Sequence, residues 1–244
     1  MTVSRPALRS RATPRVRLSL AVGLLVASGA TPVAAEWDLG IEGGTVIRDG
    51  SNATSLRLRA TNDRRPLTQS VYAEWLRYSG GNGYRAGYLP RYWLDERLYA
   101  FGEAEGRVDR PIRIERGVSL VGGVGYRVYD SATAGLGVEV GGGGRSTRFE
   151  ALPGESDGVE ESEGLGVVRA GAFKELADVA RLELDVDVLQ GSRLGELRAE
   201  AALLYRVPGG AIRLGYRASR ITFADDDIDA IDDTQASVGF TYGF

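Results

Sequence analysis

The sequence of 244 residues contains no cysteine and no histidine. Without cysteine, the chain has no disulfide, no thiolate metal site and no cysteine nucleophile. Without histidine, it has no serine–histidine pair, no histidine–carboxylate pair and no imidazole ligand for zinc. Paired carboxylates such as Asp185 and Asp187 remain, but they share one strand face that is expected to look toward arginines. We therefore expect a protein that is not an enzyme and that uses no cofactor.

The chain also lacks a long hydrophobic run: after residue 35, no segment approaches the roughly 20 apolar residues of a membrane-spanning helix. The first 17 residues carry five arginines and no acid, and the apolar segment 18–27 and then Val33-Ala34-Ala35 follow. This order is typical of a secretory signal peptide. We expect residues 1–35 to be cleaved and residues 36–244 to form the exported domain. The alternative is a disordered leader with a chance apolar run.

Positive charge is scarce in the exported part. Removal of residues 1–35 leaves 25 basic and 33 acidic residues, a formal net charge of −8. A strongly acidic surface repels phosphate, so a nucleic-acid partner is not expected.

From Trp37 onward, apolar residues instead recur at every second position, as do Ala236, Val238, Phe240 and Tyr242 in the last segment. Most of the alternating segments have 9–15 residues, against about five or six for soluble strands and about 9–11 for strands that cross an outer membrane. We expect an all-β fold, a transmembrane antiparallel up-and-down β-barrel of twelve strands, with ten strands as the alternative because the orientation near Tyr99 and Arg169 is ambiguous. The expected strands are 37–48, 53–61, 68–78, 84–94, 97–107, 115–129, 133–149, 162–174, 180–190, 196–206, 211–223 and 234–244.

The connections between these segments support the same topology. Short turns alternate with longer connections at 108–114, 150–161, 191–195 and 224–233, whereas those near 49–52 and 79–83 are short exceptions. Bacterial outer-membrane barrels have short periplasmic turns and longer external loops. We expect the bacterial outer membrane as the location, with membrane lipid and lipopolysaccharide as neighbours and a monomeric barrel.

The C-terminal segment carries the strongest motif. Ser237, Gly239, Tyr242 and Phe244 place a polar residue, a glycine, an aromatic and a terminal phenylalanine at fixed spacings. The motif resembles the signal that is read by the barrel-assembly machinery, which pairs with an extended segment. This machinery is the expected partner during insertion; the alternative is an ordinary core strand.

Charged residues alternate with the apolar ones and are expected to face the lumen. Because both signs occur, they form either an ion-pair network that fills the barrel or a narrow pathway with charged selectivity elements. The expected lumen charges are Glu42, Arg48, Arg57, Arg59, Arg85, Arg91, Arg127, Glu139, Glu183, Asp185, Asp187, Arg198, Glu200, Arg206, Arg213 and Arg217.

Two further features have simpler interpretations. Asp225, Asp227 and Asp229 belong to six aspartates within nine residues and could bind a divalent cation. The segment has no glycine at a bend and no closing glutamate, so we expect a solvated acidic loop rather than a metal site. The run Gly141–Gly144 lacks the context of a phosphate loop, and is expected to permit strand curvature or the close approach of a loop.

Several motifs together resemble a known family, the salt-induced outer-membrane proteins of the YdiY type, a family without assigned function. The resemblance implies an outer-membrane barrel and a link to osmotic or salt conditions, and it implies no catalytic residues. Two functions follow as hypotheses, a narrow channel for ions or small solutes and a non-conducting barrel that maintains the envelope; a soluble periplasmic β-protein is the third. The matching motifs are Trp37-x-x-Gly40, Gly50-Ser51-Asn52, the block from Tyr88 to Ala104, Asp109-Arg110, Gly125-Tyr126, Asp233-Thr234 and Phe244.

Overall fold

The computed structural model describes residues 37–48, 51–78, 81–151, 158–224 and 229–243. The expected signal peptide (1–35), Asp225, Asp227 and Phe244 lie outside these residues, as does the side chain of Arg48. In the described part, no helix is long and apolar enough to cross a membrane.

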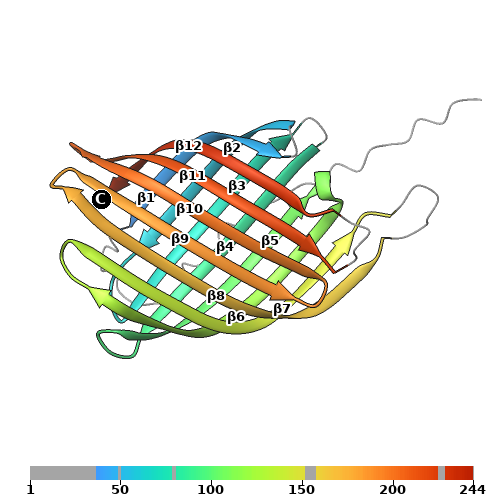
Figure 1. The fold of residues 1–244 in the computed structure, drawn as a ribbon, viewed down its shortest axis with the longest axis horizontal. Coiled ribbons are helices and arrows are strands. Elements are labelled where there is room, and N and C mark those ends of the chain that lie inside the picture. Colours follow the sequence, from blue (N-terminus) through green and yellow to red (C-terminus); the bar gives the residue numbers. More distant parts are fainter. Residues whose placement is uncertain (1–36, 49–50, 79–80, 152–157, 225–228, 244) are drawn as a thin grey trace, which may run out of the picture. The chain divides into compact units, whose positions relative to one another are not determined.

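The described residues form a closed antiparallel barrel of twelve strands (Figure 1). Each strand pairs with its neighbours in sequence, and β1 pairs with β12 to close the ring. This confirms the expected all-β barrel and the count of twelve rather than ten. The strands are β1 (Asp38–Arg48), β2 (Ser51–Asn62), β3 (Leu67–Tyr78), β4 (Gly81–Trp93), β5 (Leu98–Asp109), β6 (Ile114–Asp130), β7 (Ala134–Phe149), β8 (Glu160–Ala177), β9 (Ala180–Gly191), β10 (Leu194–Val207), β11 (Gly210–Phe223) and β12 (Ile231–Gly243).

The outer face of the barrel is apolar. Leu120, Val140 and Val238 are 62%, 58% and 60% exposed, and large apolar side chains recur at every second position of the strands. A water-soluble protein rarely exposes a continuous apolar surface of this kind. It suits the hydrocarbon layer that outer-membrane strands cross.

The two ends of the barrel differ. At one end, which we call the short-turn end, the connections are 63–66, 94–97, 131–133, 178–179 and 208–209, and Asp38 lies opposite Gly243. The other end, the loop end, carries the connections 110–113, 150–159, 192–193 and 224–230, and a short 3-10 helix at Arg110–Ile112. The connection expected to be long at 191–195 is only the two residues 192–193, because β9 and β10 each extend further than the pattern predicted.

The ambiguous strand β5 carries aromatic residues inside and small residues outside, against the usual apolar-out rule. Tyr99 and Phe101 are buried in the lumen, and glycines on the neighbouring strands leave the room for them. A Cβ at Gly125 would lie 2.2 Å from the Tyr99 ring, and a Cβ at Gly141 would lie 2.9 Å from Phe101. The glycine run therefore permits a close approach as expected, but by an aromatic ring rather than by a loop.

Candidate functional site: the charged lumen

Ion pairs that run between strands fill much of the lumen. One group, the Glu200 cluster, collects three arginines around the Glu200 carboxylate of β10. Arg57 of β2 lies 3.3 Å away, Arg213 of β11 2.6 Å and Arg217 of β11 2.8 Å. Arg217 also contacts Glu74 of β3 at 3.1 Å. Because arginine presents several donors in a planar fork, each guanidinium can join two carboxylates.

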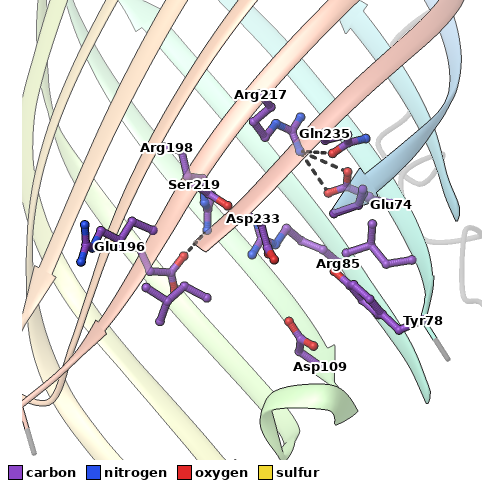
Figure 2. A pocket seen from close by; sticks show the side chains of 14 residues that line it. Glu74, Tyr78, Arg85, Asp109, Glu196, Arg198, Arg217, Ser219, Asp233 and Gln235 are labelled. Carbon is purple, nitrogen blue, oxygen red and sulfur yellow. Dashed lines mark hydrogen bonds and ion pairs between the residues drawn. The ribbon is translucent and has the colours of Figure 1, made fainter. Parts of the chain in front are cut away.

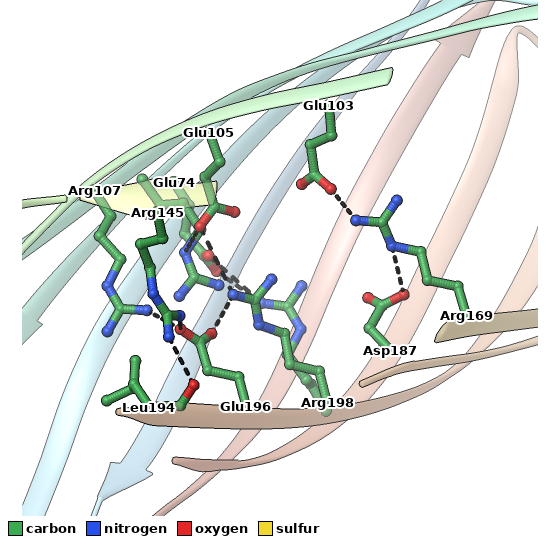
Figure 3. Close-up of polar contacts among 12 residues, drawn as sticks. Glu74, Glu103, Glu105, Arg107, Arg145, Arg169, Asp187, Leu194, Glu196 and Arg198 are labelled. Atoms are coloured by element: carbon green, nitrogen blue, oxygen red, sulfur yellow. Dashed lines mark hydrogen bonds and ion pairs between the residues drawn. The ribbon is translucent and has the colours of Figure 1, made fainter. Parts of the chain in front are cut away.

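Figure 3 shows a second group, the Glu196 cluster. It lies closer to the loop end, because Glu196 is the third residue of β10, which starts at that end. Glu196 accepts hydrogen bonds from Arg107 of β5, from Arg145 of β7 at 3.1 Å and from Arg198 of its own strand at 2.5 Å. Arg145 also bonds Glu163 of β8 at 2.6 Å and the Leu194 carbonyl oxygen at 2.7 Å. This cluster therefore connects β5, β7, β8 and β10 through the lumen.

A third group centres on Arg169 of β8, whose orientation the sequence left ambiguous. The side chain points inward and contacts Glu103 of β5, Glu139 of β7 at 3.3 Å and Asp187 of β9 at 3.4 Å. Glu139 in turn accepts a hydrogen bond from Arg91 of β4 at 2.8 Å. Pairs of this kind satisfy charges in a confined space where water is scarce.

The space between the clusters forms two adjoining cavities. The first, of about 610 Å³, lies toward the short-turn end and includes Asp63, Arg65 and Asp130 in its lining. The second, of about 280 Å³, lies deeper and reaches Arg198, Glu200 and Arg217. Their linings have five residues in common, Arg59, Arg91, Arg169, Asp185 and Asp187. The lumen is therefore hollow and charged from the short-turn end to its middle.

Beyond the middle, the lumen narrows sharply. The cavity between Arg217, Arg198 and Tyr78 holds only about 50 Å³ (Figure 2). On the far side of the Glu196 cluster, a basin of about 940 Å³ lies at the loop end, and its lining includes Glu163 and Leu194. The lumen is therefore wide at both ends and constricted at the Glu196 cluster.

An aromatic group with arginines lies at the short-turn end. The guanidinium carbons of Arg65 and Arg127 lie 4.2 and 4.4 Å from the Trp93 ring centroid, and the Tyr99 ring packs 4.5 Å from the Trp93 ring. Such cation–π contacts are strongest where the cation is partly desolvated. Trp93 therefore makes one wall of the 610 Å³ cavity.

Most of the expected lumen charges do meet inside the barrel. Glu42 joins the Glu200 cluster through Arg213, at 3.2 Å, and Glu183 joins it at 2.8 Å. Arg85 contacts Glu105 at 3.5 Å. Arg206 instead lies half-exposed near the short-turn end, beside Glu175 at 2.9 Å.

The sequence interpretation missed several charges that carry the network. Two causes account for the four of them that lie on β5 and β7. On β5 the inward face starts with aromatic residues, which hid the charges that follow; on β7 the inward positions before Arg145 are glycines, which blur the alternation. A strict count of every second residue from Tyr99 would have found those of β5. The missed residues are Glu74, Glu103, Glu105, Arg107, Arg145, Glu163, Arg169 and Glu196.

The remaining expected residues lie elsewhere. Ser237, Gly239 and Tyr242 belong to β12, where Tyr242 is 43% exposed on the outer face. A Cβ at Gly239 would lie 2.4 Å from the Glu42 side chain, so this glycine leaves room for Glu42 to reach Arg213. Asp229 is exposed at the loop end, and no group of three or more acidic side chains among the described residues could hold a metal ion.

A closed twelve-stranded barrel with an apolar outside and a charged lumen defines an outer-membrane β-barrel protein. Residues 48–244 match the model of a family described as "Protein of unknown function, DUF481", and the chain belongs to this family. No curated protein matches the chain.

Two porins are among the solved structures with a similar fold. The NanC porin is 10% identical with a TM-score of 0.57, over 84% of this chain and 98% of that one. The KdgM porin in complex with disordered oligogalacturonate is 9% identical with a TM-score of 0.50, over 84% of this chain and 99% of that one. At such low identity, the likeness establishes the fold.

Proposed function

We propose that the protein is a narrow channel of the bacterial outer membrane for ions and small solutes, with the Glu196 cluster as its constriction. The observation that carries the proposal is the hourglass form of the lumen. Charged cavities of about 610 and 280 Å³ lead inward from one end, a basin of about 940 Å³ leads inward from the other, and the Glu196 cluster lies between them. A wall built only for rigidity would need no such cavities.

The chemistry of the constriction suits this role. Rings of charged side chains are a common source of ion selectivity in pores. Arg107, Arg145 and Arg198 surround Glu196, and Arg145 and Arg198 also pair with Glu163 and Glu105, so charges of both signs line the narrowest point. The porin fold of the relatives supports passage of solutes in general, and the family resemblance supports a role under osmotic or salt conditions.

A second candidate function is a closed barrel that maintains the envelope under osmotic or salt stress. The observation that favours it is the extent of pairing across the lumen, because Arg217 and Glu74 join β11 to β3 and Arg107 and Glu196 join β5 to β10. Buried pairs are screened by salt much less than exposed ones. Such a network could keep the lumen shut at any ionic strength.

Planar-bilayer recording of the protein purified from outer membranes distinguishes the two. A channel gives discrete conductance steps in KCl, and neutralising both partners with R107Q and E196Q should raise the step size several-fold by loosening the constriction. The matched control is R116Q with E160Q, an exposed pair 3.2 Å apart at the loop end, which should leave the step unchanged. A wild-type barrel that stays silent from dilute to molar KCl favours the closed structural barrel.

The location has its own test. We propose that export removes residues 1–35 and that the short-turn end faces the periplasm, as in other single-chain barrels. The mass of the mature protein should equal that of residues 36–244. The protein should fractionate with outer membranes, and its extraction should require detergent. Recovery in the soluble periplasmic fraction would contradict the proposal.

A further inference from the structure

We infer that the two adjoining cavities form a binding site for a small zwitterionic solute, with Arg59 taking its anionic group and Asp185 its cationic group. This inference rests on the proposed channel, because it names the class of solute that the lumen accepts. Two charged side chains of this site take no part in the ion-pair network of the lumen.

Arg59 and Asp185 make no hydrogen bond or ion pair with any described residue, although nearly every other inward charge around them does. The neighbouring Arg57 pairs with Glu200 at 3.3 Å, and the neighbouring Asp187 pairs with Arg169 at 3.4 Å. Both unpaired side chains line both cavities. A charge in a confined, partly dehydrated space is costly unless something satisfies it, so each has capacity for a group from solution.

The two charges come from opposite walls. Asp185 belongs to a row on β9 in which Glu183, Asp185 and Asp187 follow one another at every second position. Arg59 is on β2 and Arg91 on β4, each five places around the ring of twelve strands from β9. Carboxylates thus outnumber arginines on the β9 wall, which also carries Arg181, whereas Arg59 and Arg91 stand on the facing wall, and the cavities lie between the two walls.

This separation of charge selects among solutes. Arg59 attracts a simple anion, but the carboxylates of β9 repel it. A simple cation is attracted by those carboxylates and repelled by Arg59. A solute that carries both charges can satisfy both walls at once, and the field between the walls orients it. The volume fits, because sites for small molecules hold about 300–1,000 Å³ and the larger cavity holds about 610 Å³.

The aromatic wall completes the site. Trp93 and Tyr99 line the 610 Å³ cavity beside Arg91 and Arg127, so the chain between the two charged groups of a solute has an apolar surface to lie against. A compact zwitterion with a short methylene chain is therefore the best match. Uncharged sugars and doubly charged anions have no comparable fit.

Trp93 also provides a reporter that does not depend on conduction. The chain has three tryptophans. The fluorescence of a W93F variant comes from the other two and is subtracted to obtain the signal of Trp93. We would titrate the detergent-solubilised protein with 6-aminohexanoate, hexanoate and hexylammonium at constant ionic strength. The zwitterion should change the Trp93 fluorescence saturably and bind at least tenfold more tightly than either singly charged analogue.

Variants assign the two ends of the solute. R59Q and D185N should each weaken 6-aminohexanoate binding at least tenfold, while R59Q should favour hexylammonium and D185N should favour hexanoate. R59K, which keeps the charge, should bind within a few fold of the wild type. The exchange R59D with D185R reverses the dipole and should restore binding that either single reversal abolishes. R116Q at the exposed rim is the control. Folding of each variant is checked by its heat-sensitive migration in detergent gels.

Two results would overturn the inference: equal affinity for hexanoate and 6-aminohexanoate, or normal zwitterion binding in R59Q and D185N. The proposed channel is judged separately by conductance. A conducting barrel without preference for the zwitterion refutes the inference and leaves the channel standing. A silent barrel that binds 6-aminohexanoate refutes the channel and leaves the binding site standing.

Discussion

Arg107 on β5 donates a hydrogen bond to Glu196 on β10, so two opposite walls of the barrel are joined through the lumen. Their side chains are 6% and 3% exposed. Arg145 on β7 bonds the same carboxylate from a third direction. Glu196 is therefore shared by three guanidinium groups, those of Arg107, Arg145 and Arg198, and the barrel should be sensitive to its loss.

Glu196→Gln should lower the free energy of unfolding by about 3–5 kcal/mol, because it removes the buried carboxylate that Arg107, Arg145 and Arg198 share. Urea unfolding in lipid vesicles measures the change. The control is Glu160→Gln, whose carboxylate is half-exposed beside Arg116; it should change stability by less than about 0.5 kcal/mol. Equal effects of the two substitutions would mean that the lumen pair is not formed in the membrane.

Arg217 and Glu74 should be energetically coupled across the barrel. Their atoms lie 3.1 Å apart, with 13% and 3% of the side chains exposed. A double-mutant cycle with Arg217→Gln and Glu74→Gln should give a coupling of about 0.5–3 kcal/mol, whereas the exposed pair Arg116 and Glu160 should give about 0–1 kcal/mol. Independent effects at Arg217 and Glu74 would contradict the cross-lumen contact.

Gly125→Ala should destabilise the barrel by about 1–3 kcal/mol, the usual cost of forcing a methyl group into packed surroundings. The new Cβ would lie 2.2 Å from the Tyr99 ring, which packs on Trp93 and donates a hydrogen bond to Glu139 at 3.1 Å. Gly106→Ala is the matched control, since a Cβ there meets nothing within 4 Å. The measurement is the unfolding curve of each variant at the same lipid composition. Equal stability of the two variants would contradict the close packing of Tyr99 against Gly125.

Leu120→Arg tests whether the apolar outer face lies in lipid. Leu120 is 62% exposed near the middle of β6, and an arginine facing lipid at the midplane of a barrel costs about 2–4 kcal/mol. Val159→Arg, 55% exposed just before β8 at the loop end, should cost only about 0–1 kcal/mol. A similar cost at both positions would place the membrane band elsewhere.

Deletion of Phe244 should reduce the amount of folded barrel in the outer membrane, if Ser237, Gly239, Tyr242 and Phe244 form the assembly signal that the sequence predicts. The measurement is the fraction of heat-modifiable protein in isolated outer membranes. Protein refolded in vitro should unfold normally, because the defect lies in recognition rather than stability. Normal assembly without Phe244 would assign β12 an ordinary structural role.

The alternation of residue types was sufficient to predict the strands. The segment predicted at 180–190 is Ala180–Gly191, and that at 211–223 is Gly210–Phe223. Among regular backbone conformations, only the β-strand places every second side chain on the same face. The alternation of apolar and polar residues therefore predicted the fold class directly. The same rule left the orientation of β5 open, because the room for Tyr99 and Phe101 inside the barrel comes from glycines on β6 and β7. Those glycines become neighbours of the rings only when the strand register is known.

The sequence by itself determined the barrel, its apolar outside and the presence of charges within it. Only the tertiary structure decided which of those charges pair. Arg57 and Arg59 are two residues apart on one strand face, and the sequence treats them alike. Ring closure brings Glu200 to within 3.3 Å of Arg57 and leaves a cavity beside Arg59. The physical reason is that contacts across a lumen depend on strand register and ring size, which no local pattern of residues encodes.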